Sequence, residues 1–290
     1  MQMTKNVHAL KIPFQVPISP GKAVERFVYV YLIYGERICL IDTGVATSEK
    51  VIFEYLKKTG RRAEDISQLL LTHSHPDHIG AARAVQETSG CKVASHDAER
   101  DWIEDIDLQA KERPVPGFYS LVGGPIRIDR ILNDGDSLSL EPGLTLDVIH
   151  TPGHSRGSLS FFLREEGALI CGDAIPIAGQ MPIYDDVADA ISSIKKLECI
   201  NGVKSLLSSW DEPRMGNSSI EVMARGIRYV KRIHEAAIKA AGNDPAPDAM
   251  AVCRAVLQEL GLPQAMANPL VARSIEAHLR VRGSLGGGIQ

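Results

Sequence analysis

The stretch Leu69–Ala82, LLLTHSHPDHIGAA, places three histidines and one aspartate between His73 and His78. The segment Ile66–Leu71, ISQLLL, is apolar at Ile66 and at Leu69–Leu71; it leads into these residues and is interpreted as a strand buried on both faces. Small residues follow, and the pattern over Ile79–Glu87 favours a helix. The sequence therefore predicts a histidine-rich loop that joins a buried strand to a helix.

The composition of this loop is typical of a metal site. His73 and His75 are two residues apart, so in an extended segment they lie on the same side. Asp77 and His78 begin the next helix and can approach from another direction. Neutral imidazole suits zinc and iron, and a carboxylate adds an anionic ligand. A lone histidine is usually a surface or core residue, but that interpretation does not explain four potential ligands together.

Two residues far along the chain repeat the theme of a ligand beyond the end of a strand. His154 lies in HTPGHSRGS, after a Pro-Gly turn and just before an expected strand, Ser158–Leu163. Asp173 lies in LICGDAI, just after another expected strand, Ala168–Cys171. Either residue alone would be an ordinary turn residue. Together with the first cluster they become candidate ligands.

These motifs resemble those of the metallo-β-lactamase superfamily. The matching residues are His73, His75, Asp77 and His78, then Thr151-Pro152-Gly153-His154, then Gly172-Asp173, with Asp42-Thr43-Gly44 earlier in the chain. The resemblance covers roughly residues 25–210. It implies an α/β fold, an αββα sandwich of two sheets between helices, with the metal site at one edge.

The resemblance also implies a role for each matching residue. His73, His75 and His154 would hold a first metal, Asp77 and His78 would help to hold a second, and Asp173 would bridge both. A bound divalent metal lowers the pKa of water from ~15.7 towards ~7 and so supplies hydroxide at neutral pH. Asp77 is the candidate catalytic residue that orients this hydroxide or relays a proton.

One position departs from the superfamily pattern. The superfamily usually supplies another histidine after a later strand, whereas here Trp210 stands at the corresponding place in VKSLLSSWDEP. Asp211 is adjacent and is a candidate substitute ligand; alternatively, it forms an ion pair with Arg214 or caps a turn. His234 and His278 lie in helical patterns and are interpreted as surface or interhelix residues, and His150 as a structural residue.

The remaining sequence predicts a catalytic domain over residues 1–215 and a helical C-terminal appendage over residues 216–290. Residues 103–135 are rich in Pro and Gly and are interpreted as a long loop or insertion. The last residues, GSLGGGIQ, are expected to be frayed. Five aromatic or apolar side chains in segments expected to flank the site suit an apolar pocket wall, with ordinary loop packing as an equal alternative; they are Trp102, Phe118, Tyr119, Met181 and Tyr184.

Composition limits the classes of partner. The net charge of −4 shows no basic surplus, so no nucleic acid is expected. No run approaches ~18 consecutive apolar residues, so no membrane span is expected. Five scattered cysteines and no recognisable signal peptide favour a reducing, cytoplasmic location. A small-molecule substrate is expected, and a homodimer is left open.

The sequence thus predicts a hydrolase that uses a metal-bound hydroxide on a small ester, thioester or lactone. Zinc is the expected metal, as one or two ions, with iron or manganese as alternatives. Two other functions are kept open: a mononuclear-iron dioxygenase acting on a persulfide, and a metal-binding domain without catalysis. Nuclease activity is a weaker alternative, because no nucleic-acid-binding module is recognised.

Overall fold

The computed structural model describes residues 1–19 and 22–282 of the chain. The expected frayed end, 283–290, lies outside the described residues. The chain divides into two compact units. The first contains Met1–His150, Gly157–Gly172 and Gly202–Met215, and the second contains Thr151–Arg156, Asp173–Asn201 and the chain from Gly216 onward.

Both sheets belong to the first unit, and each has six strands. The N-terminal sheet has the order β1-β2-β3-β4-β5-β6, and its strands from β3 to β6 run parallel. The edge strand β1 contains Pro13 and Pro17, which an edge position tolerates because a proline cannot donate to a ladder. The strands are β1 (Val7–Ser19), β2 (Lys22–Tyr34), β3 (Ile38–Ile41), β4 (Ile66–Leu70), β5 (Lys92–Ser95) and β6 (Arg130–Ile131).

The second sheet has the order β12-β11-β10-β9-β8-β7. Among its described strands only β10 and β11 pair in parallel, and the chain between them contains a helix. The strands are β7 (Ser137–Glu141), β8 (Leu144–His150), β9 (Leu159–Leu163), β10 (Ala168–Gly172), β11 (Ser205–Ser208) and β12 (Arg214–Met215).

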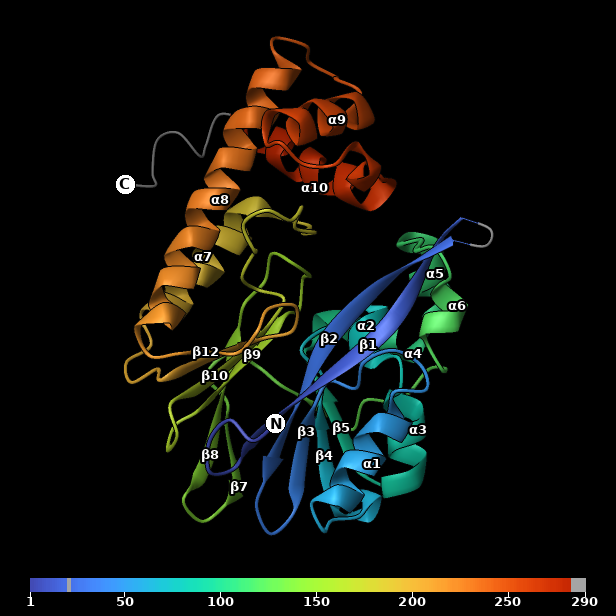
Figure 1. Cartoon of the computed structure of the whole chain (residues 1–290), viewed down its shortest axis with the longest axis vertical. Helices are drawn as coiled ribbons and strands as arrows, with labels where there is room; N and C mark the ends of the chain where they lie inside the picture. The colour runs from blue at the N-terminus through green and yellow to red at the C-terminus, as the bar shows by residue number, and fades with distance from the viewer. Residues whose placement is uncertain (20–21, 283–290) are drawn as a thin grey trace. The chain divides into compact units, whose positions relative to one another are not determined.

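Alternation along β2 explains how the first unit forms two apolar cores. Tyr31 and its alternate neighbours pack with residues of the second sheet, including Phe161, and form the core between the sheets. Leu32 and its alternate neighbours pack on the other face with Ile52 and Val85. The period of two therefore buries both faces of the strand. Figure 1 shows helices α1 (Glu49–Lys58) and α3 (Ala82–Ser89) along that second face.

The interpretation of residues 103–135 as a long loop is only partly right. Asp105 caps a helix there, because its carboxylate accepts hydrogen bonds from the backbone N–H groups of Asp107 and Leu108. Pro114 and Gly117 then divide the segment into pieces too short for a periodic signal. These short helices are α4 (Arg100–Glu104), α5 (Ile106–Glu112) and α6 (Phe118–Leu121), and β6 follows them.

The second unit is helical. Its helices are α7 (Val187–Glu198), α8 (Asn217–Ala241), α9 (Ala249–Glu259) and α10 (Pro269–Arg280). Asp248 and Asn268 cap α9 and α10 through their side chains, and Pro269 occupies the first turn of α10, where it costs no hydrogen bond. Helices α8, α9 and α10 share one apolar cluster, which includes Ile233, Val256 and Ile275.

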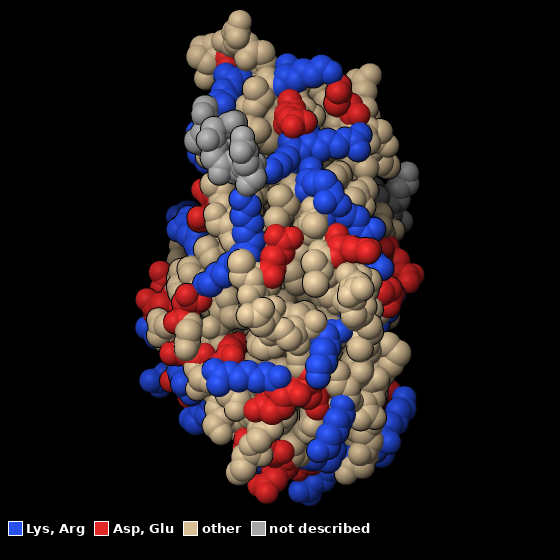
Figure 2. All heavy atoms as spheres, turned by 90° about the vertical axis from the view of Figure 1, so that its left-hand side faces the viewer, with Lys and Arg blue, Asp and Glu red and all other residues tan. Residues whose placement is uncertain are grey.

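The surface shown in Figure 2 mixes charges of both signs. Blue Lys and Arg side chains are interspersed with red Asp and Glu side chains, so this face presents no continuous field of one sign. Among the described residues, no helix combines the length and the apolar character that crossing a membrane requires.

Candidate metal centre

The histidine-rich loop follows β4, between the parallel neighbours β3 and β5. Helix α2 (Pro76–Ile79) begins with a proline, which keeps the preceding His75 extended at φ −64° and ψ 150°. His78 lies one turn into that helix. The ring of His73 lies 4.4 Å from that of His75 and 4.0 Å from that of His78. All three imidazoles are buried and gather at the end of this strand.

Asp42 fixes the orientation of His78. Its Oδ2 accepts a hydrogen bond from Nδ1 of His78 at 2.8 Å, and its Oδ1 accepts one from the backbone N–H of Thr72 at 2.8 Å. Because Nδ1 is the protonated nitrogen, the lone pair of this imidazole is on Nε2, the atom that can bind a metal. Asp42 follows β3 with φ +59°, a conformation that Asp and Asn tolerate.

Two further buried side chains hold the loop at Ser74. Oε2 of Glu99 accepts hydrogen bonds from the backbone N–H of Ser74, at 3.0 Å, and from its hydroxyl. Nε2 of Gln109 donates to the carbonyl of Ser74 at 2.6 Å. Oε1 of Glu99 also accepts from the N–H of Gly157 at 2.7 Å. Glu99 therefore joins the loop to the start of the segment that leads into β9.

The second unit contains the two other candidate ligands, His154 and Asp173. Nε2 of His154 lies 3.4 Å from Oδ2 of Asp173. Nδ1 of His154 lies 2.5 Å from the carbonyl oxygen of Ile183 and donates to it, which leaves the lone pair on Nε2. The preceding glycine is required, because Gly153 has φ +128° and a Cβ there would lie 2.4 Å from the backbone nitrogen of Ala190.

The described residues include His and Asp side chains suited to a divalent metal. They are His73, His75 and His78 in the first unit, and His154 and Asp173 in the second. The donors fit such an ion, because imidazole nitrogens with one or two carboxylates are the ligands of many zinc and iron sites. Asp77 is not in these groups; its Oδ2 lies 3.3 Å from Nε2 of His78. Its proposed roles as a ligand and a catalytic residue stay predictions.

Asp211 has another partner in the structure. Its two carboxylate oxygens accept hydrogen bonds from Nε and Nη2 of Arg214, at 2.9 and 2.8 Å. Trp210 packs against Phe14 and Phe27, with ring centroids 6.1 and 6.5 Å away. The ion pair, one of the two alternatives for Asp211, is therefore present, and its role as a metal ligand stays a prediction.

His150, His234 and His278 each lie beside another histidine ring. The ring of His150 stacks on that of His96, with centroids 4.3 Å apart. His278 is buried, and its ring lies 5.4 Å from that of His234 on α8. These contacts agree with the interpretation of His234 and His278 as interhelix residues.

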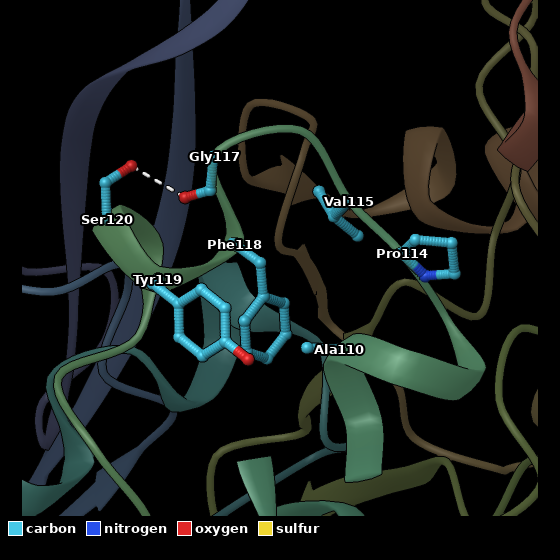
Figure 3. Close-up of a pocket in the computed structure, with 7 residues that line it drawn as sticks. All are labelled: Ala110, Pro114, Val115, Gly117, Phe118, Tyr119 and Ser120. Atoms are coloured by element: carbon cyan, nitrogen blue, oxygen red, sulfur yellow. Dashed lines mark hydrogen bonds between the residues drawn. The ribbon is translucent and has the colours of Figure 1, made fainter. Parts of the chain in front are cut away.

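An apolar pocket of about 300 Å³ lies in the first unit (Figure 3). Phe118 and Tyr119 line it with edge-to-face rings 5.4 Å apart, as expected for two of the proposed wall residues. The other lining residues are Ala110, Pro114, Val115, Gly117 and Ser120. Tyr184, also proposed as a wall residue, is instead buried in the second unit against His278.

Comparison with known proteins identifies the family. The sequence profile of the metallo-beta-lactamase superfamily matches residues 23–207. The probable metallo-hydrolase YqgX of Bacillus subtilis (strain 168) is 30% identical over 164 residues, which cover 56% of this chain and 70% of YqgX. The chain therefore belongs to the metallo-beta-lactamase superfamily. It is a metal-dependent hydrolase of that superfamily.

Two other relatives match over a smaller share of their own length. Hydroxyacylglutathione hydrolase of Hyphomonas neptunium (strain ATCC 15444) is 29% identical over 58% of this chain and 57% of its own length. Acyl-coenzyme A thioesterase MBLAC2 of Gallus gallus is 29% identical over 58% of this chain and 65% of its own. The chain thus spans less than two thirds of both enzymes.

A solved structure shows the same fold over nearly the whole chain. A metallo-beta-lactamase family protein from Thermus thermophilus, TTHA1429, aligns with a TM-score of 0.74 at 23% identity, covering 96% of this chain and 93% of that one. The expected metallo-β-lactamase fold with C-terminal helices is confirmed.

Proposed function

We propose that the protein hydrolyses a small thioester, ester or lactone at a metal centre built on the loop after β4. His73, His75 and His154 would hold a first ion, Asp77 and His78 would help to hold a second, and Asp173 would be a ligand shared by both. Asp211 is kept as a candidate ligand of the second ion. Zinc is the proposed metal, as one or two ions, and iron and manganese are the alternatives.

The observation that carries the proposal is the convergence of three buried imidazoles. The ring of His73 lies 4.4 Å from that of His75 and 4.0 Å from that of His78. A carboxylate, Asp42, holds His78 in the tautomer that a metal requires. Three imidazoles at the end of one strand offer the nitrogen donors that zinc and iron bind.

Chain connectivity supports the proposal that His154 and Asp173 bind at the same centre. Asp173 directly follows Gly172, where a Cβ would lie only 3.1 Å from the side chain of Thr72. His154 is three residues before Gly157, whose N–H bonds to Glu99, the residue that also holds Ser74. Both ligands are thus tied by short lengths of chain to residues adjacent to His73.

A divalent ion at this centre would lower the pKa of a water molecule and polarise the carbonyl of a substrate. The side chains of the protein would orient the reactants, accept the proton and keep the loop fixed. Asp77 is placed beside His78, where its carboxylate can orient the attacking oxygen and accept a proton. Asp42 and Glu99 keep the loop in place, so little reorganisation is needed when the substrate arrives.

The names of the relatives favour a thioester among the three substrate classes. One relative is a hydroxyacylglutathione hydrolase and another an acyl-coenzyme A thioesterase, and both names describe thioester cleavage. The apolar pocket lined by Phe118 and Tyr119 suits the apolar part of a small substrate. We therefore place thioesters first.

Three further properties belong to the proposal. Residues 1–215 form the catalytic domain and residues 216–290 a helical appendage, and a homodimer is compatible with both. A cytoplasmic location is part of the proposal, and it is supported by five cysteines that are thiols rather than disulfides, four of them buried, as expected in a reducing compartment.

The test combines metal analysis with a substrate screen. Purified protein is assayed for zinc, iron and manganese and then against thioester, lactone and phosphodiester substrates. We expect thioester hydrolysis that a chelator abolishes and that added Zn²⁺ restores. Fully metal-loaded protein that cleaves none of these substrates would contradict the proposal. Bound iron with oxygen uptake in the presence of a persulfide would support the dioxygenase alternative instead.

A further inference from the structure

Helix α10 contacts the short segment that orients His154. The carbonyl of Ile183 accepts the hydrogen bond from Nδ1 of His154, so the position of this carbonyl sets the direction of the imidazole ring. Backbone N–H groups of Asp185 and Asp186 both donate to the carbonyl of Gly153, at 2.7 and 3.1 Å. The residues just after Ile183 are thus joined to the turn that carries His154.

Four hydrogen bonds or ion pairs fix the two residues after Ile183 to α10. The N–H of Tyr184 donates to Oγ of Ser274 at 3.0 Å, and its hydroxyl bonds to Nε2 of His278. The carbonyl of Asp185 accepts from Nη2 of Arg280 at 2.6 Å, and its carboxylate pairs with Arg273 at 3.0 Å. These partners lie on two successive turns of one helix, so the segment is fixed by several side chains rather than by a single contact.

Helix α8 holds the beginning of the same segment. A Cβ at Gly226 would lie 3.2 Å from Cγ2 of Ile175 and 3.3 Å from the carbonyl of Pro176, so this helix is packed closely against the chain just after Asp173. The segment from Asp173 to Asp186 is therefore anchored near both of its ends by C-terminal helices. Nε2 of His154 lies 3.4 Å from Asp173 within the same unit.

We infer that α10 is a positioning element for the metal centre: Ser274 and Arg280 hold Tyr184 and Asp185 so that the Ile183 carbonyl orients His154. This inference rests on the proposed role of His154 as a metal ligand. It gives helix α10 a functional role at the ligand His154. Partners of metal-binding histidines typically contribute 10- to 100-fold to metal affinity, because they fix the tautomer and ring orientation.

The test measures Zn²⁺ affinity of the full-length protein, by titration of metal-free protein against a chromophoric chelator. Ser274→Ala removes the acceptor of the Tyr184 N–H, and Arg280→Ala removes an exposed donor to the Asp185 carbonyl without opening the core. We expect each variant to bind the first Zn²⁺ about 10-fold more weakly. The visible absorption of bound Co²⁺ should also change, because the geometry of one ligand is altered.

Glu276→Gln is the matched control, because Glu276 is exposed on the same helix. It should bind as wild type does, and thermal unfolding of each metal-free variant shows whether α10 is still folded. Should Ser274→Ala fail to fold, Arg280→Ala decides the question alone. Wild-type affinity and an unchanged Co²⁺ spectrum in the folded variants would overturn the inference.

A His154→Ala variant separates this inference from the proposed function. If His154→Ala loses the first metal while Ser274→Ala and Arg280→Ala retain it, only the role of α10 is wrong. If His154→Ala itself binds metal as wild type does, the proposed ligand set is wrong, and with it the basis of the inference.

Discussion

Asp42 and His78 are 36 positions apart in the sequence, yet Nδ1 of His78 donates a hydrogen bond to Oδ2 of Asp42 at 2.8 Å. Both side chains are buried. The same carboxylate also accepts from the backbone N–H and the hydroxyl of Thr72, at 2.8 and 2.7 Å. Asp42 therefore couples the end of β3 to the loop after β4 and selects the metal-binding tautomer of His78.

Asp42→Asn tests this coupling. Asparagine has nearly the same size and tolerates the positive φ of this position, but its neutral amide is a weaker acceptor for the imidazole N–H. We expect the affinity for the ion that His78 binds to fall 10- to 100-fold, measured by titration of metal-free protein. Glu54→Gln, an exposed change on α1, is the control. Unchanged affinity in Asp42→Asn would show that the tautomer is set in another way.

Asp77→Asn tests the proposed proton transfer. The amide cannot accept a proton, so we expect kcat for a thioester substrate to fall ~10²-fold or more. Metal analysis of the same sample must show that the first ion is still bound, which separates chemistry from metal loss. Kinetics equal to those of the wild type would remove Asp77 from the mechanism.

Asp211→Ala tests the alternatives for the position beside Trp210. Because Arg214 occupies both carboxylate oxygens, we expect the metal stoichiometry to stay at the wild-type value. The indole of Trp210 cannot replace a histidine ligand, since its nitrogen is only a donor, so the second ion should bind more weakly than the first. Loss of second-site metal in Asp211→Ala would instead identify Asp211 as a ligand.

His278 makes stability depend on pH. Burial, and then the nearby His234, lower the pKa of His278 to about 3, and its ring faces the hydroxyl of Tyr184 and the ring of His234. In the unfolded chain the pKa returns to about 6.5. Between these values the unfolded state binds more protons, so the free energy of unfolding decreases as the pH falls from about 6.5 towards 3.

His278→Gln should reduce this pH dependence. At pH 7 the variant loses a hydrogen bond and should be less stable by ~1 kcal/mol. Its free energy of unfolding should then decrease less steeply than that of the wild type between pH 6.5 and 4. Urea unfolding of metal-free protein, with chelator present throughout, measures both values. Parallel pH profiles of the two proteins would show that His278 titrates normally in the folded state.

The sequence predicts the strand β4 and the loop from His73 to His78 well, because most of the candidate metal ligands lie together in this short stretch. The segment Ile66–Leu71, ISQLLL, ends in three leucines directly before the loop, which favours a buried strand, and the observed β4 covers Ile66–Leu70. The loop from His73 to His78 is unusual enough in composition to identify a metal site. Gly153 and Gly172 are turn residues, and each directly precedes one of the two distant candidate ligands, His154 and Asp173.

The residues that hold this loop were not predictable in the same way. Glu99 and Gln109 contact Ser74 across separations of 25 and 35 positions, and neither belongs to a motif or a periodic pattern. Asp42 and His78 were both visible as parts of motifs, but the hydrogen bond between them was not predicted. The contacts of α10 with Tyr184 and Asp185 span about ninety positions and depend on tertiary packing alone.

The most direct test of the account compares His75→Ala with His150→Ala. His75 belongs to the proposed ligand set, whereas His150 stacks on His96 and lies outside it. The measurement is metal content and thioester turnover of the same preparations. The account predicts that His75→Ala loses most of its metal and all detectable turnover, while His150→Ala keeps both. Full metal content with full turnover in His75→Ala would contradict it.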